Sequence, residues 1–403
     1  MDTLRQFNDK VNARIFSGAI QSIDKKIKTL KEEGYDVYLA HGHMHLTAMI
    51  NKIDLNVIKG VLTDLPRDRF NLNIPVYTYK EFYEKHSRIN KSYVLFLEAA
   101  PFGFSSPGYE HAVLKHKKTL EDKFDNIVVD IDFYDDLVLE KLEAGFEQDV
   151  EDVYLSKKPR ASVVVLSGLG NDVVLSRMLE GLVNHTREIH DTLEFIVVLN
   201  GCPDYSSVYA SSQLNGLNFK IVNLKENMGI AGGFNAGIEA SGTDFVFMLQ
   251  DDIKINDDKF ISRYLDILEK NSDVGLIGGY SGAKLFLNPG YPNVNNTKCF
   301  DVESVSPKEE ECVEVDEVLC HAMCYRKSVG AKFDLLFNPN GLEDIDFSFN
   351  VRQKGFKVLL SPIKMENLRS DGVTRKFINP LITRKFHYNY FYRKHRNLLK
   401  LKK

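Results

Sequence analysis

An unbroken apolar run from Phe245 to Leu249, followed at once by Gln250, Asp251 and Asp252, constrains the fold of this chain most. Such a run is typical of a strand that is buried on both faces of a parallel sheet. Ligands of open α/β sheets bind at the carboxyl ends of the strands. Two adjacent carboxylates at that position suit a hard divalent cation, although a solvated acidic turn gives the same pattern. The run therefore predicts an α/β fold with a candidate metal site.

The segment before this run repeats a strand-and-helix pattern. Apolar strands are expected at Ser162–Leu166, Phe195–Leu199 and Phe219–Leu224, with a helix over Val173–His185. Strands that alternate with helices form a parallel sheet. We expect three βα units that lead into the strand at Phe245.

The first part of the chain predicts a second, smaller α/β unit of the Rossmann type. Its strands are expected at Val37–Ala40, Val57–Thr63, Ile74–Val76, Tyr93–Leu97 and Ile127–Ile131, after an amphipathic helix that ends at Gly34. Only Gly42 of a three-glycine dinucleotide fingerprint is present, with Asp64 about 20 residues further on. This favours a structural, partner-contacting or regulatory unit over a dinucleotide site. The alternating His41, His43 and His45 suit either metal ligands or a turn that enters a helix.

Length and composition set the broad class. A chain of 403 residues is long enough for two or three domains, and a net charge of −4 offers no argument for nucleic-acid binding. Its five cysteines are an odd number and scattered, which suits a reducing cytoplasm. Cys320, His321 and Cys324 form no paired zinc knuckle, so free thiols are favoured. With no signal peptide and no apolar run of membrane length, we expect a cytoplasmic protein.

A change in charge marks the expected boundary between domains. Residues 132–160 are rich in acids and then turn basic at Lys157, Lys158 and Arg160. The expected domains are residues 1–155, residues 160–375 and a basic, aromatic C-terminal segment at residues 376–403.

A glycine-rich stretch lies between the third strand and the acidic one. Asn227 to Gly237 holds four glycines and two alanines in eleven residues. In a helix each glycine costs about 1 kcal/mol relative to alanine, but glycines let backbone amides at a helix start approach a phosphate. Tight packing of the helix on the sheet would explain Gly233 and Gly237, but not the whole run.

Several motifs in this order resemble family 2 glycosyltransferases of the GT-A fold, most closely those that transfer rhamnose or galactofuranose. The resemblance covers about residues 160–400. Its motifs are Asn227–Gly237, the acids after the apolar strand, Cys320–Lys327, Phe333–Phe337 after Ala331 and Lys332, Gly341–Phe347 with Glu-Asp-x-Asp, and Arg352–Phe356.

The resemblance implies an inverting glycosyltransferase. It would move a sugar from a nucleotide diphosphate, UDP or dTDP, to a hydroxyl of a cell-surface glycan that is lipid-carried or polymeric. Asp344 would be the catalytic base, with Glu343 and Asp346 on one side of a helix start to orient it or raise its pKa. The implied donor-binding residues are Ser167, Asn171, Asn200, Asn227, Gly229, Gly232, Gly233, Asn235 and Asp251. The implied acceptor-binding residues are His321, Ala322 and Met323.

The implied cofactor is Mn²⁺ or Mg²⁺ on Asp252. Three positions depart from the family pattern: Gln250 and Asn200 replace aspartates, and Asn367 replaces a histidine ligand. An asparagine carbonyl can still ligate weakly, and the neighbouring Glu366 is an alternative ligand. These departures put metal affinity and nucleobase choice in question.

The C-terminal segment has no acid after Arg375 and interleaves basic with aromatic residues, including Arg396. A helix of this kind suits an anionic membrane surface at the inner face of the cell membrane, or packing on the catalytic domain. No recognition motif for RNA accompanies the charge. The expected partners are a nucleotide-sugar and a glycan or lipid-linked acceptor, and oligomerisation is left open.

Two rival functions remain. A sugar-phosphate nucleotidyltransferase also places acids after a glycine-rich segment, but it needs basic residues at the first strand, which Ser167–Asn171 lacks. A non-catalytic glycan- or nucleotide-binding module would explain Gln250, Asn200 and the missing histidine.

Overall fold

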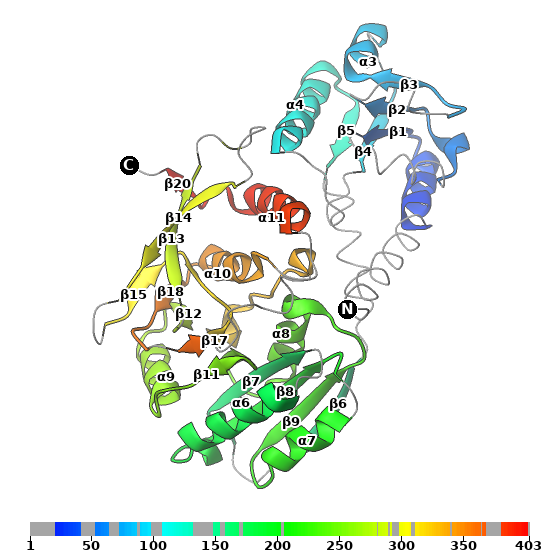
Figure 1. Cartoon of the computed structure of the whole chain (residues 1–403). Coiled ribbons are helices and arrows are strands. Elements are labelled where there is room, and N and C mark those ends of the chain that lie inside the picture. The colour runs from blue at the N-terminus through cyan, green and yellow to red at the C-terminus, as the bar shows by residue number, and fades with distance from the viewer. Residues whose placement is uncertain are drawn as a thin grey trace. The chain divides into compact units, whose positions relative to one another are not determined.

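The computed structural model divides the chain into two compact units, each of which is described by itself (Figure 1). The described residues are 21–41, 53–63, 72–86, 89–97, 107–131, 148–153, 158–168, 172–202, 205–279, 281–288, 291, 298–307, 311–338, 341–363, 365–367 and 380–401. One unit comprises Met1–Gly145, Pro289–Cys299 and Asn379–Arg393, and the other Phe146–Asn288, Phe300–Ile378 and Lys394–Lys403.

The first unit holds a five-stranded sheet in the order β3-β2-β1-β4-β5. Its strands are β1 (Asp36–His41), β2 (Gly60–Thr63), β3 (Val76–Thr78), β4 (Ser92–Phe96) and β5 (Ile127–Asp130). All neighbouring pairs are parallel. Helices α3 (Tyr79–Lys85) and α4 (Pro107–Lys123) follow β3 and β4. The prediction of a small α/β unit is confirmed, because each predicted strand region contributes a strand.

Several predicted features of this unit meet the limits of the described residues. Residues 21–32 are helical and bury Ile23, Ile27 and Leu30, as the amphipathic pattern predicts. The remnant of the dinucleotide fingerprint at Gly42 and Asp64 lies outside the described residues, and so do His43 and His45.

The second unit is built on a nine-stranded sheet in the order β15-β18-β12-β17-β10-β7-β8-β9-β6. Its elements are β6 (Gln148–Val153), β7 (Ala161–Gly168), α6 (Asp172–His185), β8 (Leu193–Asn200), α7 (Tyr205–Gln213), β9 (Phe219–Leu224), α8 (Gly229–Ala240), β10 (Phe245–Gln250), α9 (Phe260–Lys270), β12 (Val274–Gly278), β15 (Val313–Val315), β17 (Ala322–Arg326), α10 (Glu343–Gln353) and β18 (Lys357–Leu360). Strands β10, β7, β8 and β9 are parallel neighbours, so the three predicted βα units are confirmed.

Smaller elements complete the fold. A pair of strands, β11 (Ile253–Lys254) and β19 (Glu366–Asn367), forms its own sheet, and β13 (Gly282–Leu287), β14 (Phe300–Val305), β16 (Glu317–Val318) and β20 (Lys400–Leu401) form another. Helix α11 (Pro380–His395) begins in the first unit and ends in the second. Short 3₁₀ turns lie at Leu55–Val57, His190–Thr192, Lys327–Val329 and Leu335–Phe337.

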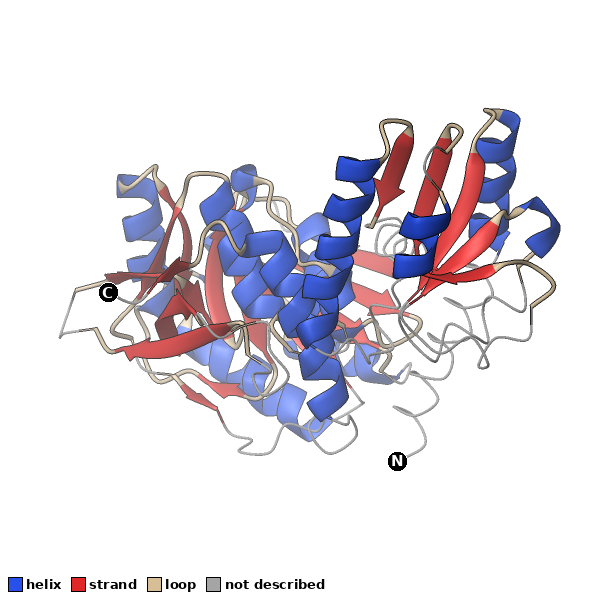
Figure 2. Cartoon of the chain, turned by 90° about the horizontal axis from the view of Figure 1, so that it is seen from above, coloured by secondary structure: helices blue, strands red, loops and turns tan. Residues whose placement is uncertain are grey.

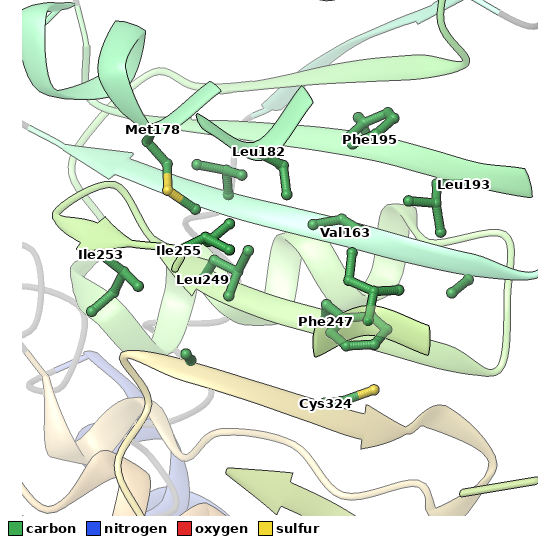
Figure 3. Close-up of a cluster of buried hydrophobic side chains, with 14 of the residues drawn as sticks. Val163, Met178, Leu182, Leu193, Phe195, Phe247, Leu249, Ile253, Ile255 and Cys324 are labelled. Atoms are coloured by element: carbon green, nitrogen blue, oxygen red, sulfur yellow. The ribbon is translucent and has the colours of Figure 1, made fainter. Parts of the chain in front are cut away.

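Helices cover both faces of the nine-stranded sheet, as a doubly buried sheet requires (Figure 2). On one face, side chains of α6, α7 and α9 pack against alternate residues of the central strands, including Val163, Phe195 and Phe247 (Figure 3). On the other face, Phe234 of α8 and Phe347 of α10 both stack on Phe333. Strand β10 has its interior residues buried, which confirms the prediction of a doubly buried strand.

Strand β6 pairs antiparallel with β9 at the edge of this sheet, although its residues fall within the range 1–155 that was expected to form the first domain. The limits of the expected domains stay a prediction. Among the described helices, none combines the length and apolarity that a bilayer span requires.

Candidate active site

The acidic pair and the predicted acceptor segment lie side by side at the carboxyl end of β10, in the middle of the nine-stranded sheet. Strand β10 lies between β7, which is parallel to it, and β17, which is antiparallel. The carboxyl end of β10 therefore lies beside the amino end of β17. The Gln250 N–H donates to the carbonyl of His321 at 3.1 Å, and the Asp251 N–H donates to the carbonyl of Leu166 at 3.1 Å.

Asp251 is held by a predicted donor-binding residue. Its carboxylate is buried and accepts a hydrogen bond from the hydroxyl of Ser167 at 2.8 Å. The two residues come from β7 and the end of β10, which the register of the parallel pair brings together. Asn171, the other residue predicted from this loop, lies outside the described residues.

Asp252 differs from Asp251 in having an oxygen without a partner. Only 9% of the residue is exposed, and its Oδ1 makes no hydrogen bond within the part of the chain that the structure describes. A buried carboxylate oxygen needs compensation by a donor or a cation. Asp252 therefore fits the role of one ligand to a divalent ion.

The other two predicted metal ligands lie close in the fold but fit less well. Strand β19 pairs with β11 directly after Asp252, and Asn367 lies opposite Ile253. The Glu366 carboxylate is 59% exposed and lies 3.3 Å from the ammonium of Lys254. No group of three His, Cys, Asp or Glu side chains suited to a metal ion occurs in the described ranges. Metal binding by Asn367 or Glu366 stays a prediction.

The start of the glycine-rich helix is built by two asparagines. Helix α8 begins at Gly229, whose φ of 69° favours glycine. Its N–H donates to Asn227 Oδ1 at 3.0 Å. Asn200 accepts from the N–H of Met228 at 2.7 Å and donates to the carbonyl of Gly229 at 2.9 Å. Where the family has an aspartate, Asn200 therefore holds the loop, and its amide group supplies the donor that a carboxylate lacks.

Two of the four glycines serve packing on the sheet. A Cβ on Gly233 would lie 2.4 Å from Leu166, and one on Gly237 would lie 2.4 Å from Val164. Asn235 exchanges two hydrogen bonds with the backbone of Phe333, at 2.8 and 2.9 Å. The side chain of Asn235 thus positions a distant segment, while its predicted contact with the donor stays untested. Gly232 is buried in the same helix.

Helix α10 carries the predicted catalytic pair at its first turn. Leu342, before the helix, has a φ of 72°, which is strained for a residue with a side chain. Glu343 is buried and accepts a hydrogen bond from the N–H of Gly341. Burial and the neighbouring Asp344 raise the pKa of Glu343 to about 8. Burial also raises the pKa of Asp344, although the Ile345 N–H and His321 counteract this.

The acceptor segment reaches Asp344 through its first residues. Burial raises the pKa of Asp344, and two neighbours oppose this rise: the His321 side chain and the backbone N–H of Cys320. Both groups therefore lie beside the Asp344 carboxyl group. Cys320 accepts from the Gln250 amide at 3.2 Å. Ala322 and Met323 are 0% and 1% exposed inside β17. Of the three predicted acceptor residues, His321 is the partly exposed one.

Asp346 has partners that were not foreseen. It is fully buried, and its carboxylate lies 2.8 Å from Lys394 and 2.6 Å from Nε2 of His395. Asn350 donates to it at 2.8 Å. Burial would raise the pKa of Asp346, but Lys394 and His395 outweigh burial and hold it below its usual value. Asp346 therefore tethers α10 to the end of α11, and its carboxylate bonds these residues rather than orienting Asp344.

One acidic residue near Asp344 was missed altogether. Glu317 of β16 is 5% exposed, and burial followed by the charges of Asp344 and Asp316 raises its pKa to about 8. No motif marks it in the sequence. The five cysteines are free thiols.

Comparisons with known proteins support the class of enzyme. Residues 172–327 match the family model described as glycosyl transferase family 2. A search among curated proteins gave no match.

Three solved structures illustrate how distant the structural likeness is. A structure of GalNAc-T7 with UDP, GalNAc and Mn²⁺ is 12% identical, with 53% of this chain and 44% of that chain covered and a TM-score of 0.42. Mannosyltransferase PcManGT from Pyrobaculum calidifontis, with GDP-Man and Mn²⁺, is 12% identical over 71% of this chain and 81% of that one, with a TM-score of 0.40. S. aureus TarS 1-349 is 16% identical over 51% and 58%, with a TM-score of 0.37. The chain thus spans less than half the length of the first of these proteins.

The matched range runs from α6 to β17 and includes the glycine-rich helix, the acidic pair and His321. The mixed, mainly parallel sheet has the arrangement expected for a GT-A fold. The match of residues 172–327 to this family model confirms the predicted enzyme class, a glycosyltransferase.

Proposed function

We propose that this chain is an inverting glycosyltransferase that moves a sugar from UDP or dTDP to a hydroxyl of a cell-surface glycan. One observation carries the proposal. Gln250, directly before the acidic pair, donates its N–H to the carbonyl of His321, and His321 and the Cys320 N–H lie beside Asp344. This link between the end of β10 and the surroundings of Asp344 supports a donor site and a base that act on one substrate pair.

Asp344 is suited to act as the base. Its pKa is raised by burial, so it holds a proton more readily than an ordinary aspartate. In the proposed step, the acceptor oxygen attacks the anomeric carbon from the face opposite the diphosphate. The bond from that carbon to the diphosphate breaks, and the hydroxyl proton passes to Asp344. A single displacement of this kind inverts the anomeric centre.

The donor side needs positive charge for the departing diphosphate. Asp252, whose Oδ1 has no hydrogen-bond partner among the residues that the structure describes, would hold a divalent cation such as Mn²⁺ or Mg²⁺, which supplies a Lewis acid when bound. Asp251, fixed by Ser167, would face the ribose or the donor sugar. The backbone of α8 near Gly229 and Gly232 offers N–H groups at a helix start, where a phosphate binds favourably.

A transfer assay tests this function. Purified chain is incubated with UDP-, dTDP- and GDP-sugars, Mn²⁺ or Mg²⁺, and octyl glycosides as acceptor probes. We expect donor turnover that EDTA abolishes, and an anomeric configuration in the product opposite to that of the donor. Asp301→Asn, an exposed acid on β14, is the matched control and should behave as wild type. Retained configuration would contradict inversion, and absence of binding and turnover with every donor would contradict the enzyme.

The proposed place of work is the cytoplasmic face of the cell membrane, with a lipid-linked or polymeric acceptor. The basic and aromatic C-terminal segment supports this through its charge. Binding to vesicles with anionic lipid, compared with neutral vesicles, tests it. Equal binding to both kinds of vesicle would contradict the proposal.

A further inference from the structure

Glu317 is a buried acid, one of whose carboxyl oxygens finds no hydrogen-bond partner in the described part of the chain. It is 5% exposed, and its Oε2 makes no hydrogen bond among the described residues. Buried polar groups are nearly always bonded, so an exception calls for an explanation.

The fold treats a structural buried acid differently. Glu194 is 1% exposed, lies 3.0 Å from Lys220, and accepts from the Ser162 hydroxyl at 2.6 Å and the Gly242 N–H at 2.9 Å. Every one of these contacts compensates its charge. A buried carboxylate with a structural role needs such contacts, because they offset the free-energy cost of removing its charge from water.

The acid next to Glu317 in the chain has cationic partners. Its neighbour Asp316 lies 2.9 Å from Arg352 and 4.0 Å from Lys284. Asp316 also accepts from the N–H of Leu285 at 2.8 Å. Adjacent acids on one short segment are therefore divided, with Asp316 in an ion pair and Glu317 outside it.

Glu317 lies beside the proposed base. Ser348 of α10 links the two segments, because it accepts from the Val318 N–H at 3.2 Å and donates to the carbonyl of Asp344 at 2.9 Å. Among charged groups, Asp344 acts most strongly on Glu317. Three acids therefore lie together around the start of α10: Glu317, Glu343 and Asp344.

We propose that Glu317 is a further acceptor-binding residue, whose carboxyl group hydrogen-bonds a sugar hydroxyl next to the one that Asp344 deprotonates. The inference rests on the proposed function. With a pKa of about 8, Glu317 is mostly protonated at neutral pH and both donates and accepts hydrogen bonds. A polyhydroxylated ligand offers both kinds of partner. A neutral acid at this position also avoids a second full charge beside Asp344.

Three variants test this role in the full chain. Glu317→Ala removes the group, Glu317→Gln keeps its size and one donor and one acceptor, and Glu314→Ala removes an exposed acid from the neighbouring strand β15. For each variant we would measure the transfer to octyl glycosides and the hydrolysis of the donor without acceptor. The thermal melting temperature of each variant shows whether it is folded. We expect Glu317→Ala to raise the KM for the acceptor about tenfold or more, the loss expected for a buried hydrogen bond to a substrate.

The other readouts separate binding from stability. Donor hydrolysis should stay within about twofold in Glu317→Ala, and Glu317→Gln should keep the acceptor KM within about threefold of wild type. The inference is overturned if Glu317→Ala matches Glu314→Ala in acceptor KM, or if donor hydrolysis falls in parallel with transfer. A wild-type chain that neither transfers to the octyl glycosides nor binds them in saturation-transfer NMR overturns the proposed function itself.

Discussion

Two acids on the first turn of α10 lie two positions apart and have opposite surroundings. Asp344 meets Glu343 and Glu317, both of which are themselves acids with a pKa of about 8. Asp346 meets Lys394, His395 and Asn350, and its pKa is lowered. Burial alone acts on Asp344 and Asp346 in the same direction, so the difference comes from the partners.

This contrast separates reactive from structural carboxylates. A buried acid whose charge is compensated by a lysine and a histidine has no reason to take up a proton. A carboxyl group that lies beside other acids is stabilised when it binds a proton, because protonation removes the repulsion between like charges. The same helix therefore carries a carboxyl group with a raised pKa at its start and a tether directly behind it.

Replacing Asp344 should have the largest effect. Asp344→Asn removes the proposed base, and we expect transfer to fall about 10²- to 10⁴-fold, the usual contribution of a positioned base. The melting temperature should not fall, because no cation is left unpaired. Steady-state rates and thermal melting measure the two effects. Activity above about half of wild type would place the base elsewhere.

Breaking the tether should act on stability first. Lys394→Met removes the lysine from Asp346, which keeps His395, and from Asp334, which lies 2.8 Å from Lys394. Loss of one partner from a buried ion pair costs about 3–5 kcal/mol. Urea unfolding measures the loss.

Two further variants control for the tether. Lys394→Arg should recover part of the lost stability because it keeps the charge, and the exposed Lys400→Met should behave as wild type. A Lys394→Met chain as stable as wild type would show that the tether is not structural.

The two kinds of acid should also respond to pH in opposite ways. Glu343 has a pKa of about 8 in the folded chain against an ordinary 4.5, so it stabilises the fold fully below pH 4.5, and this contribution is lost as the pH rises through 8. Asp346, whose pKa is lowered from 3.8, contributes above that pH and loses its contribution as the pH falls. Glu343→Gln should flatten the decline in unfolding midpoint between pH 5 and pH 8. An unchanged slope would contradict the raised pKa of Glu343.

The smallest effect, on nucleotide binding, is expected for a change at Glu366. Glu366 and Asp252 are the acids predicted to bind the metal, so they allow the same comparison at the proposed donor site. Asp252 has an oxygen that no described residue bonds, whereas Glu366 is exposed and paired with Lys254. Asp252→Asn should weaken Mn²⁺-dependent binding of UDP by about tenfold, while Glu366→Gln should change it less than twofold. Isothermal titration with and without Mn²⁺ checks both. Equal losses in the two variants would make Glu366 a ligand.

Local patterns predict much of this fold. Strand β10 is recognisable because five apolar residues in a row are typical of a doubly covered strand, and the regular spacing of strands and helices predicts its parallel neighbours. The Glu-Asp-x-Asp motif predicts acids at the start of a helix, and α10 begins at Glu343. These features depend on residues close together in the chain.

The partners of the same acids depend on residues far apart. Nothing local distinguishes Asp344 from Asp346, because the cation that defines Asp346 lies 48 residues away at Lys394. Glu317 likewise gains its meaning from Asp344, across a hydrogen-bonded link through Ser348. Sequence by itself determined the α/β architecture, the class of enzyme and the position of the acids at the strand end and the helix start. Tertiary structure decided which acids are compensated, because a pKa is set by the charges and the water that packing leaves around each carboxyl group.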